Sequence, residues 1–328
     1  MRVLYLIGNG FDLAQGIKTR YSDFYEAKIK SLPEEESIIG KLRNSITENT
    51  ETWSDMEKGL GRFTAEMGGI DDLDNTYRFL RDNLRDYLKE EQAKLIVTPK
   101  SVAANRKLLL QPGVGLPPES IDAINNYVAN NKRNNKILDI NIISFNYTDV
   151  VERAFGYEGA EINLEKTDPD VVTKLEHIYK VHGDLDHMVM GVADESQIAN
   201  KAFANGLDAS EELLKPKYIA ARRDYVWKRC YDCISKADMI VLYGLSIGET
   251  DKNWWTKVVE RVENDGNIRV IVYGHQDPVF DDVAVQRRAE RKIYKRLFNS
   301  AGRTNLQYGL HDNRVFITFD DTIFKALF

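Results

Sequence analysis

The sequence predicts a doubly wound α/β fold with a mostly parallel sheet and a large helical insertion. Short apolar segments alternate with helix-length amphipathic segments on either side of residues 23–136, which is the pattern of a parallel sheet covered by helices. Each strong apolar segment ends in a glycine or a small polar cluster. Residues 23–136 instead show helical spacing. We therefore expect an α/β domain of residues 1–22 and 137–328, interrupted by an inserted helical module.

The chain begins with an apolar run, Val3–Ile7, that ends abruptly in Gly8-Asn9-Gly10. This pattern predicts a buried strand that runs into a tight turn. A helix is expected to follow at Phe11–Gln15, with Asn9 or Asp12 as its cap.

A glycine turn between a strand and a helix N-terminus can present backbone N–H groups to a phosphate. The turn therefore predicts a nucleotide pyrophosphate site. Two cations lie beside it, Lys18 and Arg20, where either can offset the charge of a bound phosphate or of Asp12, or belong to a solvated loop. The alternative is a plain strand-to-helix turn, because Leu13 replaces the third glycine of the dinucleotide-binding pattern. The residues expected at the phosphate are Gly8, Asn9, Gly10, Phe11 and Asp12.

The predicted helical module contains apolar residues at helical spacing, for example Tyr77, Leu80 and Leu84. The segment Pro112–Pro118 is expected to be a loop. Trp53, with Asp55 and Glu57 beside it, either lines a cleft or is a core aromatic with exposed neighbours.

The alternating pattern returns after Lys136. The expected strands are Ile137–Phe145, Ile178–Gly183, Met188–Val192, Met239–Tyr243, Ile268–Tyr273 and Val315–Phe319. The expected helices are Val150–Phe155, Ile219–Ser235, Asp251–Val262 and Asp281–Phe298. The two cysteines, Cys230 and Cys233, lie in a helical pattern, which favours ordinary packing over a redox role.

Polar residues follow four of the expected strands, at Gly8–Gly10, Asn146, His182-Gly183 and Gly244–Ser246. The carboxyl ends of parallel strands share one edge of a sheet, where ligands bind at the switch in strand order. Four clusters at one edge favour a nucleotide site. There, His182 can act as a base or orient a hydroxyl, Asn146 can hold a ribose hydroxyl or a water, and Ser246 can bind a phosphate or ribose.

Composition excludes several other classes of protein. The 328 residues carry a net charge of −6, which disfavours binding to a phosphate backbone. The first apolar run is too short for a signal peptide, and no stretch approaches the ~20 apolar residues of a membrane span. We therefore expect a soluble, cytoplasmic protein without a membrane partner. No His, Cys and Asp grouping has metal-ligand spacing, so no metal is expected.

The polar clusters resemble sirtuin motifs. Gly8–Asp12, followed by Gly16-Ile17, resembles the first sirtuin loop, Gly-Ala-Gly-x-Ser and then Gly-Ile. Ser144–Thr148 resembles the Thr-x-Asn-x-Asp element, His182-Gly183 the His-Gly element, and Gly244–Ile247 the Gly-Thr-Ser-Leu element. The order along the chain is the same.

The fuller motif set is closer still to the bacterial abortive infection AbiH family. It spans residues 6 to 251, about three quarters of the chain. Its segments are Leu6–Ala14, Ser22–Phe24, Trp53–Glu57, Ser144–Thr148, His182-Gly183 and Gly244–Asp251.

These resemblances imply a sirtuin-like Rossmann core that binds NAD, and a role in defence against phage. In sirtuin-like defence proteins this core splits NAD into nicotinamide and ADP-ribose. The implied catalytic residues are Asn146, which positions a ribose hydroxyl or the attacking water, and His182, the base or ribose-orienting group. The NAD-binding residues that the resemblance implies are Gly8, Asn9, Gly10, Asp12, Gly244 and Ser246. Phe11, Arg20 and Gly183, which lie in or beside the same clusters, are expected to bind NAD with them.

The sequence departs from the sirtuin pattern in one spacing, since the segment from Asn146 to His182 is longer than in sirtuins, and in three features of its residues. Asp12 stands in place of the serine, Thr148 in place of the aspartate, and the four zinc cysteines are absent. Without the zinc module that helps to build the acyl-peptide groove, protein deacylation is not expected.

Two other functions stay open. The same fold can sense NAD or ADP-ribose without cleaving it. The basic segment Arg287–Arg296 can instead direct the protein to nucleic acid, although a solvated helix face or a subunit contact explains it as well. The sequence leaves the trigger and the oligomeric state open, a homo-oligomer included.

Overall fold

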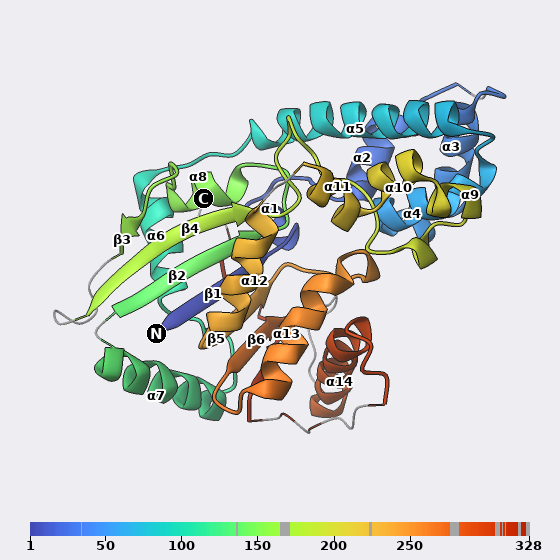
Figure 1. The fold of residues 1–328 in the computed structure, drawn as a ribbon. Coiled ribbons are helices and arrows are strands. Elements are labelled where there is room, and N and C mark those ends of the chain that lie inside the picture. The colour runs from blue at the N-terminus through green and yellow to red at the C-terminus, as the bar shows by residue number, and fades with distance from the viewer. Residues whose placement is uncertain are drawn as a thin grey trace.

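The computed structural model describes residues 1–33, 35–135, 137–164, 171–222, 225–275, 282–305, 309, 311, 313–320 and 323–325. It is a mixed α/β structure built on a seven-stranded, mostly parallel sheet (Figure 1). Six strands are parallel to their neighbours, and the two-residue β3 pairs antiparallel with β4 at one edge. In spatial order the strands are β3 (Ile162–Asn163), β4 (Val172–Lys180), β2 (Ile137–Ser144), β1 (Arg2–Ile7), β5 (Met239–Tyr243), β6 (Arg269–Tyr273) and β7 (Val315–Thr318).

Helices cover both faces of the sheet. On one face a core that includes Tyr5, Ile140 and Phe155 packs under four helices and the segment around Phe324. On the other face a core that includes Leu6, Trp254 and Leu297 packs under three helices. The first group is α1 (Gly10–Ala14), α6 (Pro99–Leu109), α7 (Pro118–Asn135) and α8 (Val150–Phe155). The second group is α12 (Val226–Lys236), α13 (Lys252–Asn264) and α14 (Val283–Ser300).

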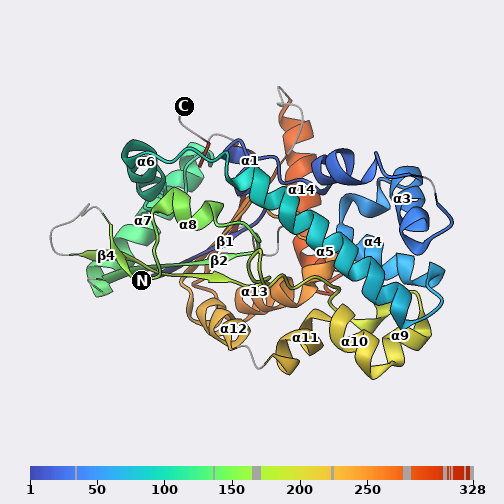
Figure 2. The same ribbon diagram turned by 90° about the horizontal axis from the view of Figure 1, so that it is seen from above.

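The remaining helices lie beyond the carboxyl ends of the strands (Figures 1 and 2). Apart from the last of them, which packs on a core of the sheet, they share a third core that includes Trp53, Leu80 and Met190. The longest, α5, has 23 residues and is roughly 35 Å long. The helices of this part are α2 (Tyr21–Phe24), α3 (Ile38–Glu48), α4 (Met56–Phe63), α5 (Ile70–Gln92), α9 (Lys201–Asn205) and α10 (Leu207–Leu213), with α11 (Lys215–Ala221) leading back to the sheet. A π-helical turn, Tyr25–Ile29, follows α2.

Residues 23–135 are helical, as predicted, but they pack in two places. The segment up to α5 belongs to the third core, whereas Leu109 of α6 and Ile124 of α7 belong to a core of the sheet. The Tyr5 hydroxyl on β1 donates to the Leu109 carbonyl over 2.9 Å. The division of the chain into two domains at residue 23 and at Lys136, which lies outside the described residues, stays a prediction.

Most of the expected elements are confirmed, and two expected strands need correction. β4 begins at Val172, well before Ile178, and ends before His182. Because β4 is covered on its outer side only by β3, seven of its nine side chains stay partly or fully exposed and its apolar pattern in the sequence is weak.

The expected strand Met188–Val192 is wrong. Met190 and Val192 contact the third core and Val189 contacts a sheet core, so the alternation reflects two cores rather than a ladder. Only an isolated bridge joins Val192 to Leu214.

One expected helix, Ile219–Ser235, is in fact two, α11 and α12. The expected start of the last helix, Asp281, lies outside the described residues. Among the described helices none is both long and apolar enough to cross a membrane.

The strand order reverses between β1 and β5, and the turns that follow these two strands pack against each other. The N–H of Gly8 donates to the carbonyl of Tyr243, and the N–H of Gly10 donates to the carbonyl of Gly244, each over 2.9 Å. A Cβ on Gly10 would lie 2.4 Å from Cα of Gly244. Gly244 also has a φ of +67°, which L side chains rarely adopt. Backbone contact therefore requires glycine at both positions.

Alanine at position 244 carries two costs, the positive φ and the overlap of its methyl group with Gly10. We expect the overlap alone to lower the free energy of unfolding of Gly244→Ala by about 2 kcal/mol or more. Gly302→Ala is the matched control, since Gly302 has a φ of +78° and nothing within 4 Å of the added Cβ. The measurement is the free energy of unfolding in urea. Equal losses in the two variants would show that the contact between the turns contributes nothing.

Candidate functional site

Three side chains meet at the carboxyl ends of β1 and β2: Asp12 on α1, and Asn146 and Thr148 after β2. We call them the Asp12 group. Nδ2 of Asn146 donates to Oδ1 of Asp12 over 2.7 Å, and the Thr148 hydroxyl donates to Oδ2 over 2.5 Å. All three side chains are buried. The sheet therefore brings together the first and second polar clusters, as the sequence predicts.

The environment of Asp12 alters its chemistry. Burial raises the pKa of Asp12 from 3.8 to about 7, even though the bonds from Thr148 and Asn146 oppose the rise. The carboxyl group is then close to half-ionised at neutral pH. Oδ1 of Asn146 is buried and has no hydrogen-bond partner among the described residues. It is an acceptor that a hydroxyl or a water would satisfy.

His182 follows β4 and is buried, at 5% exposure. Its Nε2 lies 2.9 Å from Oδ1 of Asp251, and its Nδ1 lies 3.1 Å from the carbonyl oxygen of Phe145. The chain itself therefore engages both ring nitrogens.

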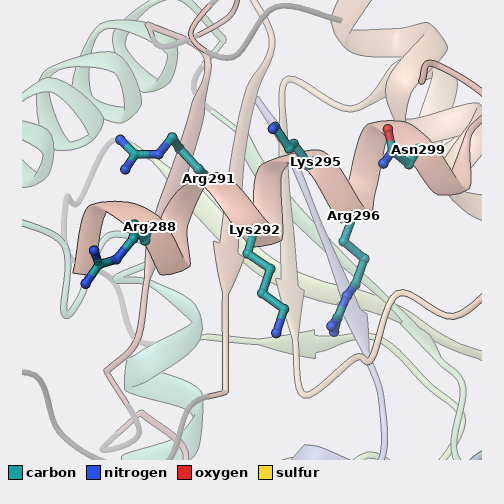
Figure 3. Close-up of a pocket in the computed structure, with 6 residues that line it drawn as sticks. All are labelled: Arg288, Arg291, Lys292, Lys295, Arg296 and Asn299. Atoms are coloured by element: carbon teal, nitrogen blue, oxygen red, sulfur yellow. The ribbon is translucent and has the colours of Figure 1, made fainter. Parts of the chain in front are cut away.

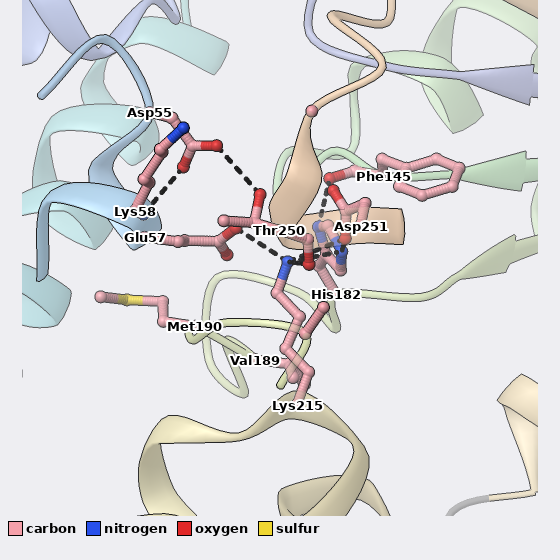
Figure 4. Close-up of polar contacts among 12 residues, drawn as sticks. Asp55, Glu57, Lys58, Phe145, His182, Val189, Met190, Lys215, Thr250 and Asp251 are labelled. Carbon is pink, nitrogen blue, oxygen red and sulfur yellow. Dashed lines mark hydrogen bonds and ion pairs between the residues drawn. The ribbon is translucent and has the colours of Figure 1, made fainter. Parts of the chain in front are cut away.

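Asp251 belongs to a buried ion cluster with Glu57, His182 and Lys215 (Figure 4). Nζ of Lys215 lies 2.8 Å from Oε2 of Glu57 and 2.8 Å from Oδ1 of Asp251. It also lies 3.3 Å from Nε2 of His182. The Lys215 side chain is only 1% exposed, so its ammonium group is shielded from water and is neutralised by the two carboxylates instead.

The cluster shifts the pKa values of its members. Burial alone would raise the pKa of Asp251, but the charges of Lys215 and His182 hold it well below the ordinary value. Burial alone would lower the pKa of Lys215, but Asp251 and Glu57 raise it above the ordinary value. Burial raises the pKa of Glu57 against the opposing effect of Lys215. Lys215 and Asp251 are therefore a charged pair at neutral pH.

The same region joins the helical part of the molecule to the edge of the sheet. Glu57 lies on α4, whereas Asp251 lies in the segment after β5. Next to them, the Thr250 hydroxyl donates over 3.0 Å to Oδ2 of Asp55, and Oδ1 of Asp55 caps α4 by accepting from the N–H of Lys58. The segment after β5 thus bonds directly to the first turn of α4.

Sequence reasoning missed most of the ion cluster. Trp53 is a core aromatic, as one expectation had it, but Glu57 beside it is also buried. Lys215 was not identified from the sequence as a candidate site residue. Its only sequence signal is its place after Leu213-Leu214 and before a proline, where a lysine interrupts an apolar run.

The structure places the predicted residues of the first turn in different surroundings. The ring of Phe11 is fully buried against Phe155 and Phe324. Asn9 stands at the N-cap position of α1, one of the two expected caps, but its side chain makes no capping hydrogen bond. The Asn9 side chain bonds to Thr19 instead of the helix backbone. The Asp12 carboxylate accepts from the side chains of Asn146 and Thr148.

The other predicted residues lie near the surface or in turns. Arg20 is exposed at the start of α2. Gly183 has a φ of +75°, and a Cβ there would overlap the carbonyl oxygen of His187, so the turn itself requires this glycine. Ser246 is exposed, and its carbonyl accepts from Nη1 of Arg296 over 3.3 Å. The part of the chain that the structure describes contains no group of three or more acidic, His or Cys side chains that could hold a metal ion.

A family model described as "Bacteriophage abortive infection AbiH" matches residues 4–273. The matched span contains both the Asp12 group and the ion cluster, and it ends before α14. No curated protein matches the chain.

We expect Lys215→Met to cost about 3–5 kcal/mol of stability, because it leaves two buried carboxylates without their cation. Lys217→Met is the matched control two residues away. Lys217 is 42% exposed and pairs with Glu195 at the surface, so its loss should cost less than about 1 kcal/mol. Urea unfolding at pH 7 gives both values, and similar losses would show that the ion cluster contributes no special stability.

We also expect Asp12 to make stability fall as pH rises. The pKa of Asp12 is about 7 in the folded state against 3.8 ordinarily, so its contribution is complete below pH 4 and is lost as pH rises towards 7. The free energy of unfolding of the wild type, relative to Asp12→Asn, should fall by up to roughly 4 kcal/mol across this range. Exposed Asp208 provides the control, Asp208→Asn, whose profile should stay parallel to that of the wild type. A parallel profile for Asp12→Asn would contradict the raised pKa.

Proposed function

Because the chain belongs to the bacteriophage abortive infection AbiH family, we propose that it is a phage-defence protein that binds NAD and cleaves it to nicotinamide and ADP-ribose. The observation that carries the chemical part of the proposal is the Asp12 group. It combines a carboxyl group with a pKa of about 7 and an unsatisfied Asn146 oxygen at the carboxyl edge of a parallel sheet.

The sheet supports a nucleotide at this edge. Taken in chain order, the six parallel strands lie in the spatial order 3-2-1-4-5-6, which is that of dinucleotide-binding Rossmann folds. In such sheets ligands bind outside the carboxyl ends of the strands, at the switch in order. Here the switch lies between β1 and β5, and the Asp12 group follows β1 and its neighbour β2. The assignment to a sirtuin-like Rossmann fold rests on this order and on the motif resemblance.

The Asp12 group has the chemistry that hydrolysis of NAD needs. The bond between C1′ of the ribose and the nicotinamide nitrogen breaks, and its electron pair leaves on the nicotinamide. A water oxygen forms the new bond to C1′, and the proton that this water loses passes to Asp12. Oδ1 of Asn146 would accept a hydrogen bond from the ribose or from that water. The ionised Asp12 carboxylate would also stabilise the positive charge that develops on the ribose.

Other residues position rather than react. His182 has both ring nitrogens engaged, so we assign it the role of holding the segments after β2 and β5 in place. Ser246 and Arg296 would meet the phosphates, because this exposed serine lies beside a guanidinium group. The N–H groups of Gly8 and Gly10 and the side chain of Asn9 already bond to the chain, which leaves exposed Arg20, at the start of α2, as the nearby cation for a phosphate. The helical part, which we propose as a separate module, would cover the site.

Binding without cleavage is the second candidate function. It is favoured by the engagement of both His182 nitrogens, because a sensor needs no free base. In this reading the Asn146 oxygen and Ser246 bind NAD or ADP-ribose, and Asp12 serves to orient Asn146.

Proton NMR on one sample of protein and NAD separates the two functions. We expect free nicotinamide to accumulate, with a rate that rises with pH and levels off above about 7, the pKa of Asp12. Asn146→Ala and Asp12→Asn should each lower the rate at least about 100-fold. Exposed Asn163 provides the control, Asn163→Ala, which should keep the wild-type rate.

Saturation transfer on the same sample reports binding. Transfer to NAD without nicotinamide release, and its loss in Asn146→Ala, would replace hydrolysis with the sensor function. Absence of both signals with NAD and with ADP-ribose would overturn the nucleotide site. Urea unfolding of each variant shows whether a lost signal reflects a lost fold.

A further inference from the structure

Helix α14 concentrates positive charge in a protein whose net charge is −6. Its 18 residues include a single carboxylate, that of Glu290. Its six cationic residues are Arg287, Arg288, Arg291, Lys292, Lys295 and Arg296. The acidic balance of the whole chain therefore conceals one strongly basic element.

The cations form two rows on the exposed side of the helix. Arg288, Lys292 and Arg296 are spaced four residues apart, as are Arg291 and Lys295, so members of each row lie one above another. With Asn299 these five residues line a surface pocket of about 460 Å³ (Figure 3). Figure 3 shows Lys292 and Arg296 projecting to the same side of the helix. All five are exposed.

Within the described residues, much of this charge has no ion-pair partner. In the part of the chain that the structure describes, Arg288, Lys292 and Lys295 form no ion pair. Like charges four residues apart on one face destabilise a helix. An ordinary solvated face avoids this cost by mixing signs, as α5 does with Arg85 between Asp82 and Asp86. The charge pattern of α14 is thus unfavourable in the isolated protein and suited to an external polyanion.

We propose that this face of α14 docks on the phosphate backbone of a nucleic acid duplex. Clustered, exposed cations supply sequence-independent binding to phosphates. Proteins that bind single strands add aromatic side chains on which bases stack. The aromatic residues of α14, Tyr294 and Phe298, are buried at 2% and 1% exposure and offer no such platform. A duplex, which presents phosphates and keeps its bases stacked inside, is therefore the better match.

The surface is separate from the Asp12 group but adjoins the proposed phosphate side. Arg296 bonds to the carbonyl of Ser246, and the Ser300 hydroxyl donates to the carbonyl of Ile247 over 3.2 Å. A duplex on α14 would border the segment after β5. Because α14 lies beyond the family match at residues 4–273, the match carries no information about this surface, and the proposal rests on the helix itself.

The test is fluorescence anisotropy of a labelled DNA duplex of about 20 base pairs, titrated with the full chain between about 50 and 200 mM salt. We expect affinity to fall steeply with salt. The triple variant Arg288→Gln, Lys292→Gln, Lys295→Gln should bind at least about 10-fold more weakly at low salt. In a plot of the logarithm of the binding constant against the logarithm of the salt concentration, the variant should also have a slope smaller in magnitude by about three. Its rate of NAD cleavage should equal that of the wild type. Duplex binding therefore tests this proposal and NAD cleavage tests the nucleotide site, and either one can be overturned without the other.

A triple variant with the same change in charge is the control: Lys41→Gln, Lys100→Gln, Lys228→Gln. These exposed lysines lie on α3, α6 and α12, and their loss should leave binding unchanged. Equal weakening in both variants, or no duplex binding at low salt, would overturn the proposal. So would tighter binding of a single strand than of the duplex, or a self-association that only the α14 variant abolishes. A matched RNA duplex shows which duplex is preferred.

Discussion

The buried ammonium of Lys215 is the constraint on which the arrangement of the candidate site depends. A charge with 1% exposure requires compensation, and the two compensating carboxylates come from different parts of the chain. Glu57 belongs to the helices beyond the sheet, and Asp251 belongs to the segment after β5. His182 joins through Asp251. The cost of burying one cation thus ties the helical part, the segment after β4 and the segment after β5 into one geometry.

This linkage separates two kinds of polar group at the sheet edge. In the ion cluster every charge has an opposite charge beside it, so the cluster is suited to hold structure. In the Asp12 group the carboxyl group is bonded only to neutral donors, and one amide oxygen is unsatisfied. Its proton equilibrium therefore lies near neutrality, where the group can gain or lose a proton during a reaction. Proximity to the sheet edge alone does not distinguish these roles, but the charge of the partners does.

The sequence predicted the parts of the fold that depend on local pattern. The buried strand Met239–Tyr243 and the helix Val150–Phe155 have the predicted bounds. Each can be recognised from neighbouring residues alone, the strand as a short apolar run and the helix as a segment of helical spacing. The meeting of Asp12 with Asn146 followed from the rule that parallel strands share a carboxyl edge. Lys215 could not be predicted in this way. Its role depends on Glu57, 158 residues away in sequence, and a pattern along the chain contains no information about that distance. Met188–Val192 failed for a related reason, since two separate cores produced an alternation typical of a strand.

The contact between Gly10 and Gly244 has a consequence for how sequences of this family are compared. Each glycine occupies the space that a side chain on the other would need, so neither position tolerates a larger residue while the β1 and β5 turns keep this arrangement. Relatives that share the sheet would therefore retain both glycines whether or not they bind a nucleotide. Invariance at these two alignment columns would report the packing of two turns, and evolutionary evidence for a ligand must come from other columns, such as those of Asp12 and Asn146.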